Sequence, residues 1–402
     1  MKKLIFLLLA MVLTACASGQ PDTLQTEISF GPSTETTPPK PSAAAEKYRE
    51  ICDLVDAVAQ KYGAMGMQVA VVEKGVVTEA FSWGWATKDL EPMTRDHKIR
   101  VASLSKIALG ITAQLLREEG AISLEQDISD YWEIPVQNPR HPQTPITLQT
   151  ILTHTSSLRA YGVATSRERE DVQKRLQSGG FTNARPGDMG DWHYNNYAFA
   201  VLGMTLELAS GETVDDTLRR RLFDAMDIDA AFAGSFLQDP DKIATLYRSG
   251  GQIARTKEKQ QTMTRDPKPG ATGTYFAGGF MCSAYDFAKL LSLLANDGSY
   301  KGSRLLEENS VAHMEKILET PTPGGSYQGQ PMRLWQDLYG RKRIYFHTGS
   351  AYGVYNCASY DPETGDGVVV LTTGAAGSKD KYGIYKVCSE LNAYLYPLLQ
   401  TQ

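Results

Sequence analysis

The sequence predicts a mixed α/β (α+β) protein in which both ends of the chain contribute strands to one antiparallel sheet. Five segments are β-rich, two near the N-terminus and three in the last third: 67–72, 76–83, 344–348, 352–360 and 368–373. The middle part, at about 111–265, shows mainly helical periodicity. We therefore expect a five-stranded antiparallel sheet, flanked by N- and C-terminal helices, with an all-helical region inserted between its two halves.

Amphipathic helices are predicted at both ends of the folded part. Apolar residues recur at helical spacing over 46–62, where Gly63 ends the pattern, and again over 379–395. These two segments carry Cys52 and Cys388, so packing of the helices would bring their thiols together. The residues leave two alternatives open, a disulfide or buried thiols. The same alternatives apply to the other two downstream cysteines, Cys282 and Cys357.

The first 45 residues have the pattern of a secretion signal followed by a tether. Two lysines precede an apolar run, over 4–12, that is too short to span a bilayer. The sequence Leu13-Thr14-Ala15-Cys16 follows and resembles the lipobox of bacterial lipoproteins. That resemblance implies a signal peptide over 1–15 and lipidation of Cys16. Residues 16–45 are rich in Ser, Thr, Pro and Ala and predict a flexible tether to a folded domain over 46–398.

These segments predict an extracytoplasmic protein of the cell envelope, with the membrane as its partner through a lipid anchor. The formal net charge of -5, without a long basic run, disfavours a nucleic-acid partner. With six histidines and no His-Glu-x-x-His or paired Cys-x-x-Cys motif, the sequence does not support a zinc site. We expect neither a metal nor a cofactor.

The stretch from 100 to 120 combines a serine, a lysine and the start of a helix. Ser103 precedes an apolar helical pattern that Gly120 is placed to end. Lys106 lies three positions further on, which on a helix is one turn away on the same face. Unpaired N–H groups at a helix N-terminus also favour developing negative charge. Ser103 is therefore a candidate nucleophile with an amine beside it.

Two further motifs distinguish this Ser-x-x-Lys from a second one, Ser378 to Lys381, which we interpret as structural. Tyr194-Asn195-Asn196 precedes a buried helical pattern, and His347-Thr348-Gly349 lies on a predicted strand. In this order, the three motifs resemble those of the penicillin-recognising serine hydrolases. That family includes class C β-lactamases, D-alanyl-D-alanine carboxypeptidases and related esterases. Segments 146–158 and 278–286 resemble the family as well, and the likeness covers about 46–398.

The resemblance implies a β-lactamase/transpeptidase-like fold and a role for each motif. Asn196 would orient the lysine and a substrate amide. The N–H groups of Ser103 and Ser350 would form the oxyanion hole, and Gly349 would let the substrate lie close to the strand, next to Thr348. The general base stays open. A partly desolvated Lys106 would have a depressed pKa, and Tyr194 near cations would hold a phenolate or relay a proton.

The chain departs from the family pattern at two positions. His347 replaces the usual lysine before Thr-Gly, and a neutral imidazole attracts a substrate carboxylate less than an ammonium does. Strong β-lactamase activity is therefore not expected. Ser157 stands where a glycine is common, which changes a loop without removing a catalytic group. We interpret His154 as a structural histidine that bonds loop backbone.

The function predicted from these residues is an envelope-anchored serine hydrolase that acts by an acyl-enzyme on D-alanyl peptide, ester or β-lactam carbonyls. A D-alanyl-D-alanine carboxypeptidase-like peptidase is the preferred member of this class. The alternatives are a class C-like β-lactamase, a carboxylesterase, and a non-catalytic penicillin-binding-type module. A Ser-His-Asp hydrolase is disfavoured because the chain has no Gly-x-Ser-x-Gly motif.

Overall fold

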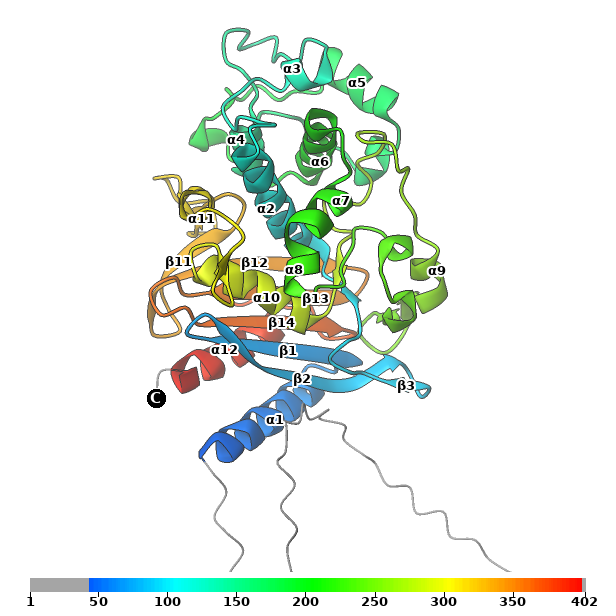
Figure 1. Ribbon diagram of the computed structural model, residues 1–402, viewed down its shortest axis with the longest axis vertical. Coiled ribbons are helices and arrows are strands. Elements are labelled where there is room, and N and C mark those ends of the chain that lie inside the picture. The colour runs from blue at the N-terminus through cyan, green and yellow to red at the C-terminus, as the bar shows by residue number, and fades with distance from the viewer. Residues whose placement is uncertain (1–42, 400–402) are drawn as a thin grey trace, which may run out of the picture.

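The computed structural model describes residues 43–399, and its centre is an antiparallel sheet of eight strands in the order β10-β11-β12-β13-β14-β1-β2-β3 (Figure 1). The strands are β1 (Gly66–Glu73), β2 (Val76–Thr87), β3 (Glu91–Pro92), β10 (Tyr327–Gln328), β11 (Arg333–Leu338), β12 (Arg341–Ala351), β13 (Val354–Tyr360) and β14 (Gly367–Thr373). β1 pairs with β14, so strands from both ends of the chain meet in the middle of the sheet. The predicted fold class and the assembly of one sheet from two ends are confirmed.

The predicted number of strands was wrong, because β3, β10 and β11 had not been recognised. β3 and β10 have two residues each, too few to show an alternating pattern. β11 has the sequence Arg-Leu-Trp-Gln-Asp-Leu, and only its two leucines are buried. Such a polar segment next to the sheet edge has little of the hydrophobic signature of a core strand.

Helices cover both faces of the sheet. Their bounds are α1 (Ala43–Lys61), α2 (Ser105–Glu118), α3 (Ser129–Trp132), α4 (Leu148–Leu152), α5 (Arg169–Gln177), α6 (Asn196–Ser210), α7 (Val214–Leu218), α8 (Asp224–Met226), α9 (Lys257–Gln261), α10 (Ala284–Ala295), α11 (Glu308–Glu315) and α12 (Lys386–Leu399). In Figure 1, α1 and α12 lie below the sheet, whereas α10 and the mainly helical part lie above it.

The alternation of side chains along the central strands divides the core into two layers. Val69 and Val71 belong to the apolar cluster shared with α1 and α12. Ala70 and Val72 belong to the cluster on the opposite face, shared with α10. Neighbouring side chains of a strand point to opposite faces, and both faces are covered, so β1 is buried along nearly its whole length and is mainly apolar. Burial of each valine contributes about 1.5–3 kcal/mol as an upper estimate.

The region from 111 to 265 is mainly helical but also contains the short pair β5 (Leu246–Tyr247) and β6 (Ile253–Arg255). Two further short pairs lie outside it: β4 (Ile99–Arg100) with β7 (Met281–Cys282), and β8 (Ser299–Tyr300) with β9 (Ser303–Arg304). All residues of α2 from Ser105 to Leu116 are buried. This central helix starts beside β12 and rises into the helical part (Figure 1).

α1 and α12 pack against each other, as a disulfide between Cys52 and Cys388 would require. The cysteines of residues 43–399 nevertheless form no disulfide. The Cys388 thiol donates a hydrogen bond to the Tyr355 carbonyl at 3.4 Å instead, and burial raises its pKa. The lipidation site predicted at Cys16 lies outside the described residues. Within 43–399, no helix combines the length and the apolar character that crossing a bilayer requires.

Candidate active site

The structure brings two of the three predicted motifs into direct contact through one ammonium group. Lys106 Nζ donates hydrogen bonds to Ser103 Oγ at 3.3 Å, to Asn196 Oδ1 at 2.8 Å and to the carbonyl of Ala277 at 3.0 Å. Ser103 and Asn196 are far apart in the sequence, at the starts of α2 and α6. The lysine therefore links the candidate nucleophile to the residue predicted to orient the substrate.

Ser103 lies in a 3-10 turn, Ala102–Leu104, directly before α2 rather than on the helix itself. Ala102 has a φ of 53°, a left-handed conformation that costs a non-glycine residue about 1–2 kcal/mol. The buried Ser105 hydroxyl secures this turn: it donates to the Ala102 carbonyl at 2.6 Å and accepts from the Phe280 N–H at 3.1 Å. The half-buried Ser103 is thus presented on a strained and fixed turn.

Lys106 is completely buried, and no carboxylate of residues 43–399 forms an ion pair with it. Burial lowers the pKa of this lysine, while the nearby Tyr194 acts in the opposite direction. Its ammonium lies 4.9 Å from the ring centre of Tyr194 and 5.2 Å from that of Phe199. A lysine with these surroundings can lose its proton more readily than an exposed one.

The two asparagines of the second motif have separate tasks. Asn195 caps α6 by accepting from the Ala198 N–H at 3.1 Å, and it donates to the Leu158 carbonyl at 2.7 Å. Asn196 is thereby left to contact Lys106. His154 accepts from the Asn195 N–H at 3.1 Å and stacks at 4.5 Å on the ring of Tyr194. This contact with loop backbone is the one predicted for His154.

The third motif lies on β12, beside the turn that carries Ser103. His347 is buried and donates its Nδ1 proton to the Thr348 carbonyl at 2.8 Å, which leaves Nε2 as the acceptor. Burial, then Lys106, then Arg333 lower the pKa of His347 well below its ordinary value. The imidazole is therefore neutral at physiological pH. Its ring centre is 6.3 Å from that of Tyr194, so the third motif approaches the second.

Gly349 makes the close approach of β12 to the nucleophile turn possible. A Cβ atom at this position would lie 2.3 Å from the Val101 carbonyl oxygen and 3.3 Å from the backbone nitrogen of Ser103. Any side chain would force the turn away from the strand. The exposed Ser350 follows Gly349 on the same strand.

β12 also has an open edge at this point. Its pairing with β11 ends at Phe346, opposite Arg333, whereas its pairing with β13 continues to Ala351. Within the described chain, residues 347–351 are therefore paired on one side only. An extended peptide is able to bind such an edge through its backbone, next to Ser103.

Arg333 is a charged residue of the site that no sequence motif indicates. Arg333 lies on β11, with its guanidinium 4.8 Å from the Phe346 ring centre, and its Nε is buried without a hydrogen-bond partner. Burial lowers its pKa and Tyr194 raises it, and the charge of Arg333 in turn lowers the pKa of His347. It has no ion pair among residues 43–399. Because β11 was not predicted, no sequence signal indicated Arg333.

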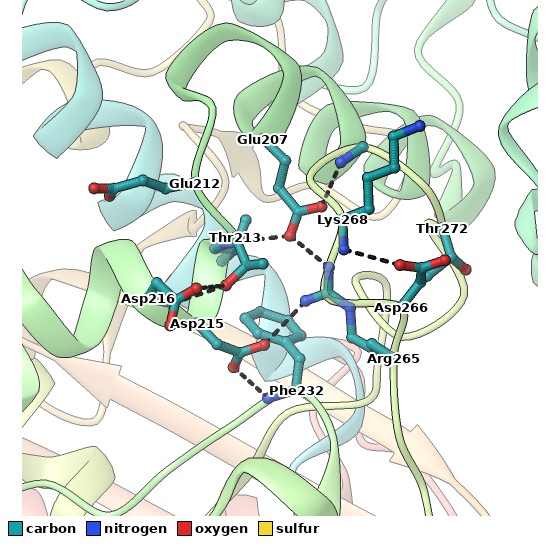
Figure 2. Close-up of polar contacts among 12 residues, drawn as sticks. Glu207, Glu212, Thr213, Asp215, Asp216, Phe232, Arg265, Asp266, Lys268 and Thr272 are labelled. Carbon is teal, nitrogen blue, oxygen red and sulfur yellow. Dashed lines mark hydrogen bonds and ion pairs between the residues drawn. The ribbon is translucent and has the colours of Figure 1, made fainter.

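A second charged cluster lies behind the segment that leads to Ala277. Figure 2 shows the Arg265 guanidinium between two carboxylates, Asp215 at 2.9 Å and Glu207. Glu207 also accepts from the N–H groups of Val214 and Gly270, at 3.0 and 2.9 Å. This triad ties the loop around Arg265 to α6 and α7. None of these hydrogen bonds involves Ser103.

Comparisons with known proteins identify the family of the chain. The family model described as Beta-lactamase matches residues 51–387. The D-alanyl-D-alanine-carboxypeptidase/endopeptidase AmpH of Escherichia coli (strain K12) is 30% identical over 173 residues, 40% of this chain and 44% of the relative. Penicillin-binding protein 4* of Bacillus subtilis (strain 168) is 26% identical over 191 residues, 44% of this chain and 40% of the relative. The matched segments thus span less than half the length of these curated relatives.

Among solved structures, the D-amino acid amidase from Ochrobactrum anthropi SV3 complexed with D-phenylalanine has a TM-score of 0.68 and 21% identity. The likeness covers 89% of this chain and 100% of the amidase, and it shows that the fold is shared. The family model matches most of the described chain, and the solved structures share its fold. The protein belongs to the Beta-lactamase family.

Proposed function

We propose that this protein is a serine hydrolase of the cell envelope that forms an acyl-enzyme on Ser103 and releases the terminal residue of D-alanyl-D-alanine peptides. The observation that carries the proposal is the buried Lys106, which bonds both Ser103 Oγ and Asn196 Oδ1 and has no acidic partner in the described chain. A cation that is left without a counter-charge is suited to give up a proton.

In the acylation step, Ser103 Oγ attacks the carbonyl carbon of the scissile amide, and its proton passes to neutral Lys106. The negative charge on the carbonyl oxygen is accepted by the N–H groups of Ser103 and Ser350. Collapse of this intermediate breaks the C–N bond, and the proton passes to the departing amine, directly from Lys106 or through Tyr194. Water then attacks the ester in the same way and restores Ser103.

The carboxylate of the departing D-alanine is assigned to the end of the β12 edge near Arg333. Side chains alternate along a strand, so Thr348 and Ser350 share a face with Phe346 and with Arg333 opposite it. Arg333 is half-buried, has a buried Nε and forms no ion pair within residues 43–399, and it can replace the missing motif lysine as the carboxylate ligand. His347, which is neutral, would not bind the carboxylate as an ion pair.

The comparison with AmpH supports this substrate class, since that relative is named as a D-alanyl-D-alanine carboxypeptidase. The same nucleophile and oxyanion hole would also accept a β-lactam or an ester carbonyl, so β-lactamase and esterase activity are the alternatives. The neutral His347 favours the peptidase over the β-lactamase.

A substrate panel tests the proposal. We expect wild-type protein to release D-alanine from an acylated D-alanyl-D-alanine peptide, to act weakly on nitrocefin and short esters, and to be labelled at Ser103 by a fluorophosphonate. Ser103→Ala should abolish all of these. A peptide with a C-terminal amide should be a poor substrate for wild type, and Arg333→Gln should reduce turnover of the free-carboxylate peptide to a similar level. Absence of labelling at Ser103 in folded protein would disprove the proposal.

We also propose that Cys16 anchors the domain to a membrane, as the lipobox resemblance implies. Expression in a bacterium that is fed labelled palmitate should yield a labelled, membrane-bound protein. Cys16→Ser should remove both the label and the membrane association. A wild-type protein without the label would contradict the anchor but not the enzyme.

A further inference from the structure

Two arginines without an acidic partner lie together at the far end of β12. The guanidinium carbons of Arg100 and Arg255 are 4.9 and 4.0 Å from the ring centre of Tyr352. Neither arginine has an ion pair among residues 43–399, whereas arginines such as Arg265 and Arg341 are each bonded to carboxylates. Burial, and the positive charge of Arg255, lower the pKa of Arg100. Two like charges in contact with one ring favour binding of an anion.

The ring that both arginines contact belongs to a residue with an unusual backbone conformation. Tyr352 and Gly353 form the two-residue turn between β12 and β13, with φ values of 53° and 85°, and the pair Ala351 and Val354 closes it. Positive φ at both positions is typical of a type I′ turn, where asparagine, aspartate or glycine is usual. An aromatic residue here costs about 1–2 kcal/mol of backbone strain. Strain of this kind is often concentrated at ligand-binding sites.

The position of this group relative to Ser103 follows from two neighbouring carbonyls. Lys106 Nζ bonds the carbonyl of Ala277, and Arg100 Nε bonds the next one, Gly278, at 2.8 Å. Arg100 and Lys106 are therefore bonded to consecutive residues of the same segment. Tyr352 follows Gly349 by three residues, about 10 Å along the strand. This direction leads away from His347, hence away from the end assigned to the leaving group.

We propose that Arg100, Arg255 and Tyr352 form a subsite for a carboxylate on the acyl part of the substrate. The enzyme would then select peptides with an acidic residue on the N-terminal side of the scissile bond, and the inference rests on the proposed function of Ser103. The two guanidinium groups donate charge-assisted hydrogen bonds to the carboxylate, and the Tyr352 ring holds them in place. Anion binding relieves their mutual repulsion.

Peptide pairs test the subsite. Each pair ends in D-alanyl-D-alanine and differs only by Glu or Gln, at the first or the second residue before it. We expect wild type to have a kcat/KM about tenfold higher for the Glu peptide of one pair, the order expected from one charge-assisted hydrogen bond. Arg255→Gln should bring this ratio close to one. Tyr352→Asn, which suits the turn but removes the ring, should reduce it as well.

The matched control is Arg248→Gln, which removes the same charge from an exposed position on the β5–β6 hairpin. We expect it to keep the wild-type ratio. Equilibrium binding of both peptides to Ser103→Ala should show the same preference without turnover. Equal kcat/KM for Glu and Gln peptides, or equal loss of preference in Arg248→Gln, would overturn the subsite alone. Absence of fluorophosphonate labelling and of all turnover would overturn the function of Ser103, and the subsite with it.

Discussion

Two buried cations of this protein have opposite surroundings. Lys106 is completely buried, and it donates hydrogen bonds to neutral oxygens of Ser103, Asn196 and Ala277, while Tyr194 is the one neighbour that raises its pKa. Arg265 is equally buried, with 1% of its side chain exposed, but it is bonded to the carboxylates of Glu207 and Asp215. Burial is therefore the same in the two cases, and the difference lies in the counter-charge.

The difference indicates what each cation is for. Two carboxylates compensate the charge of Arg265, and the arginine compensates theirs, so all three groups are tolerated in the interior. The cluster thereby joins separate segments of the chain. Lys106 has no carboxylate partner within residues 43–399. Its charged form is destabilised, its pKa is lowered, and its proton is available for chemistry. An uncompensated buried charge is thus a better guide to function than a buried ion pair.

The largest effect on the acylation rate is expected when the charge of Lys106 is removed. Lys106→Met keeps a similar volume and should slow acylation of Ser103 by about 10²–10⁴-fold, the range for loss of a general base. Its free energy of unfolding should stay within about 1 kcal/mol of wild type, because relief of the desolvation penalty offsets the lost hydrogen bonds. Fluorophosphonate labelling rates and urea unfolding measure the two quantities. A variant that is slow only because it is unfolded would contradict our interpretation.

The converse change is Arg265→Met, which leaves Glu207 and Asp215 buried without a cation. It should lower the free energy of unfolding by about 3–5 kcal/mol, as is usual when one partner of a buried pair is removed. The folded fraction should still acylate Ser103, since the triad does not contact it. Urea unfolding followed by circular dichroism measures the loss.

A triple variant provides the control for this second prediction. Adding Glu207→Gln and Asp215→Asn to Arg265→Met removes the stranded negative charges while keeping acceptors for the backbone N–H groups of Val214, Gly270 and Phe232. Stability should recover in part. If the triple variant is no more stable than the single one, the loss comes from packing of the arginine and not from charge.

A smaller effect is expected when the rate of Ser103 acylation is measured as a function of pH. Acylation by wild type should rise about tenfold per pH unit and level off at a pKa below the ordinary lysine value of 10.5, because neutral Lys106 is the active form. No inflection is expected near 6.5, because the pKa of His347 lies well below that value. A rate profile of fluorophosphonate labelling checks both points. If Tyr194→Phe abolishes the alkaline inflection, Tyr194 and not Lys106 is the base.

The same pKa has a consequence for stability. Between the lowered pKa of folded Lys106 and 10.5, the unfolded chain binds the lysine proton and the folded chain does not. Unfolding then takes up a proton, so the Lys106 contribution to stability increases with pH across that window. The difference in unfolding free energy between wild type and Lys106→Met should rise accordingly, and a difference that falls would contradict the direction of the shift.

Much of the site was predictable because its chemistry is concentrated in short motifs. Ser103 and Lys106 are one helical turn apart, and a three-residue spacing is visible in any sequence. Arg333 and Arg265 could not be found in this way. Arg333 lies on a strand with a weak pattern, and its place near His347 depends on the register of β11 against β12. Arg265 lies in a Gly- and Pro-containing loop, and its partners are contributed by α6 and α7.

The strands of the sheet likewise include some that the sequence predicts and some that it does not. The central strands were predictable because burial on both faces gives β1 and β14 the apolar runs 69–72 and 368–371. The missed strands β3, β10 and β11 lie at the two ends of the sheet, where side chains are partly exposed and pairing depends on neighbours distant in sequence. The turn at Tyr352 was assigned to a strand because nothing in its sequence but Gly353 indicates a positive φ.

The smallest change in unfolding free energy is expected for an exposed arginine. This case separates the effect of burial from the effect of ion pairing. Arg220, like Arg265, is bonded to two carboxylates, those of Glu119 at 2.9 Å and Glu212 at 3.0 Å, but 47% of its side chain is exposed. Water already solvates all three groups in the unfolded chain and largely in the folded one, and salt screens their attraction. Arg220→Gln should therefore lower the free energy of unfolding by less than about 1 kcal/mol, and less still in 1 M salt. Urea unfolding at two salt concentrations measures this change beside that of Arg265→Met. Equal losses in the two variants would mean that the number of carboxylate partners, and not burial, sets the cost of removing a cation.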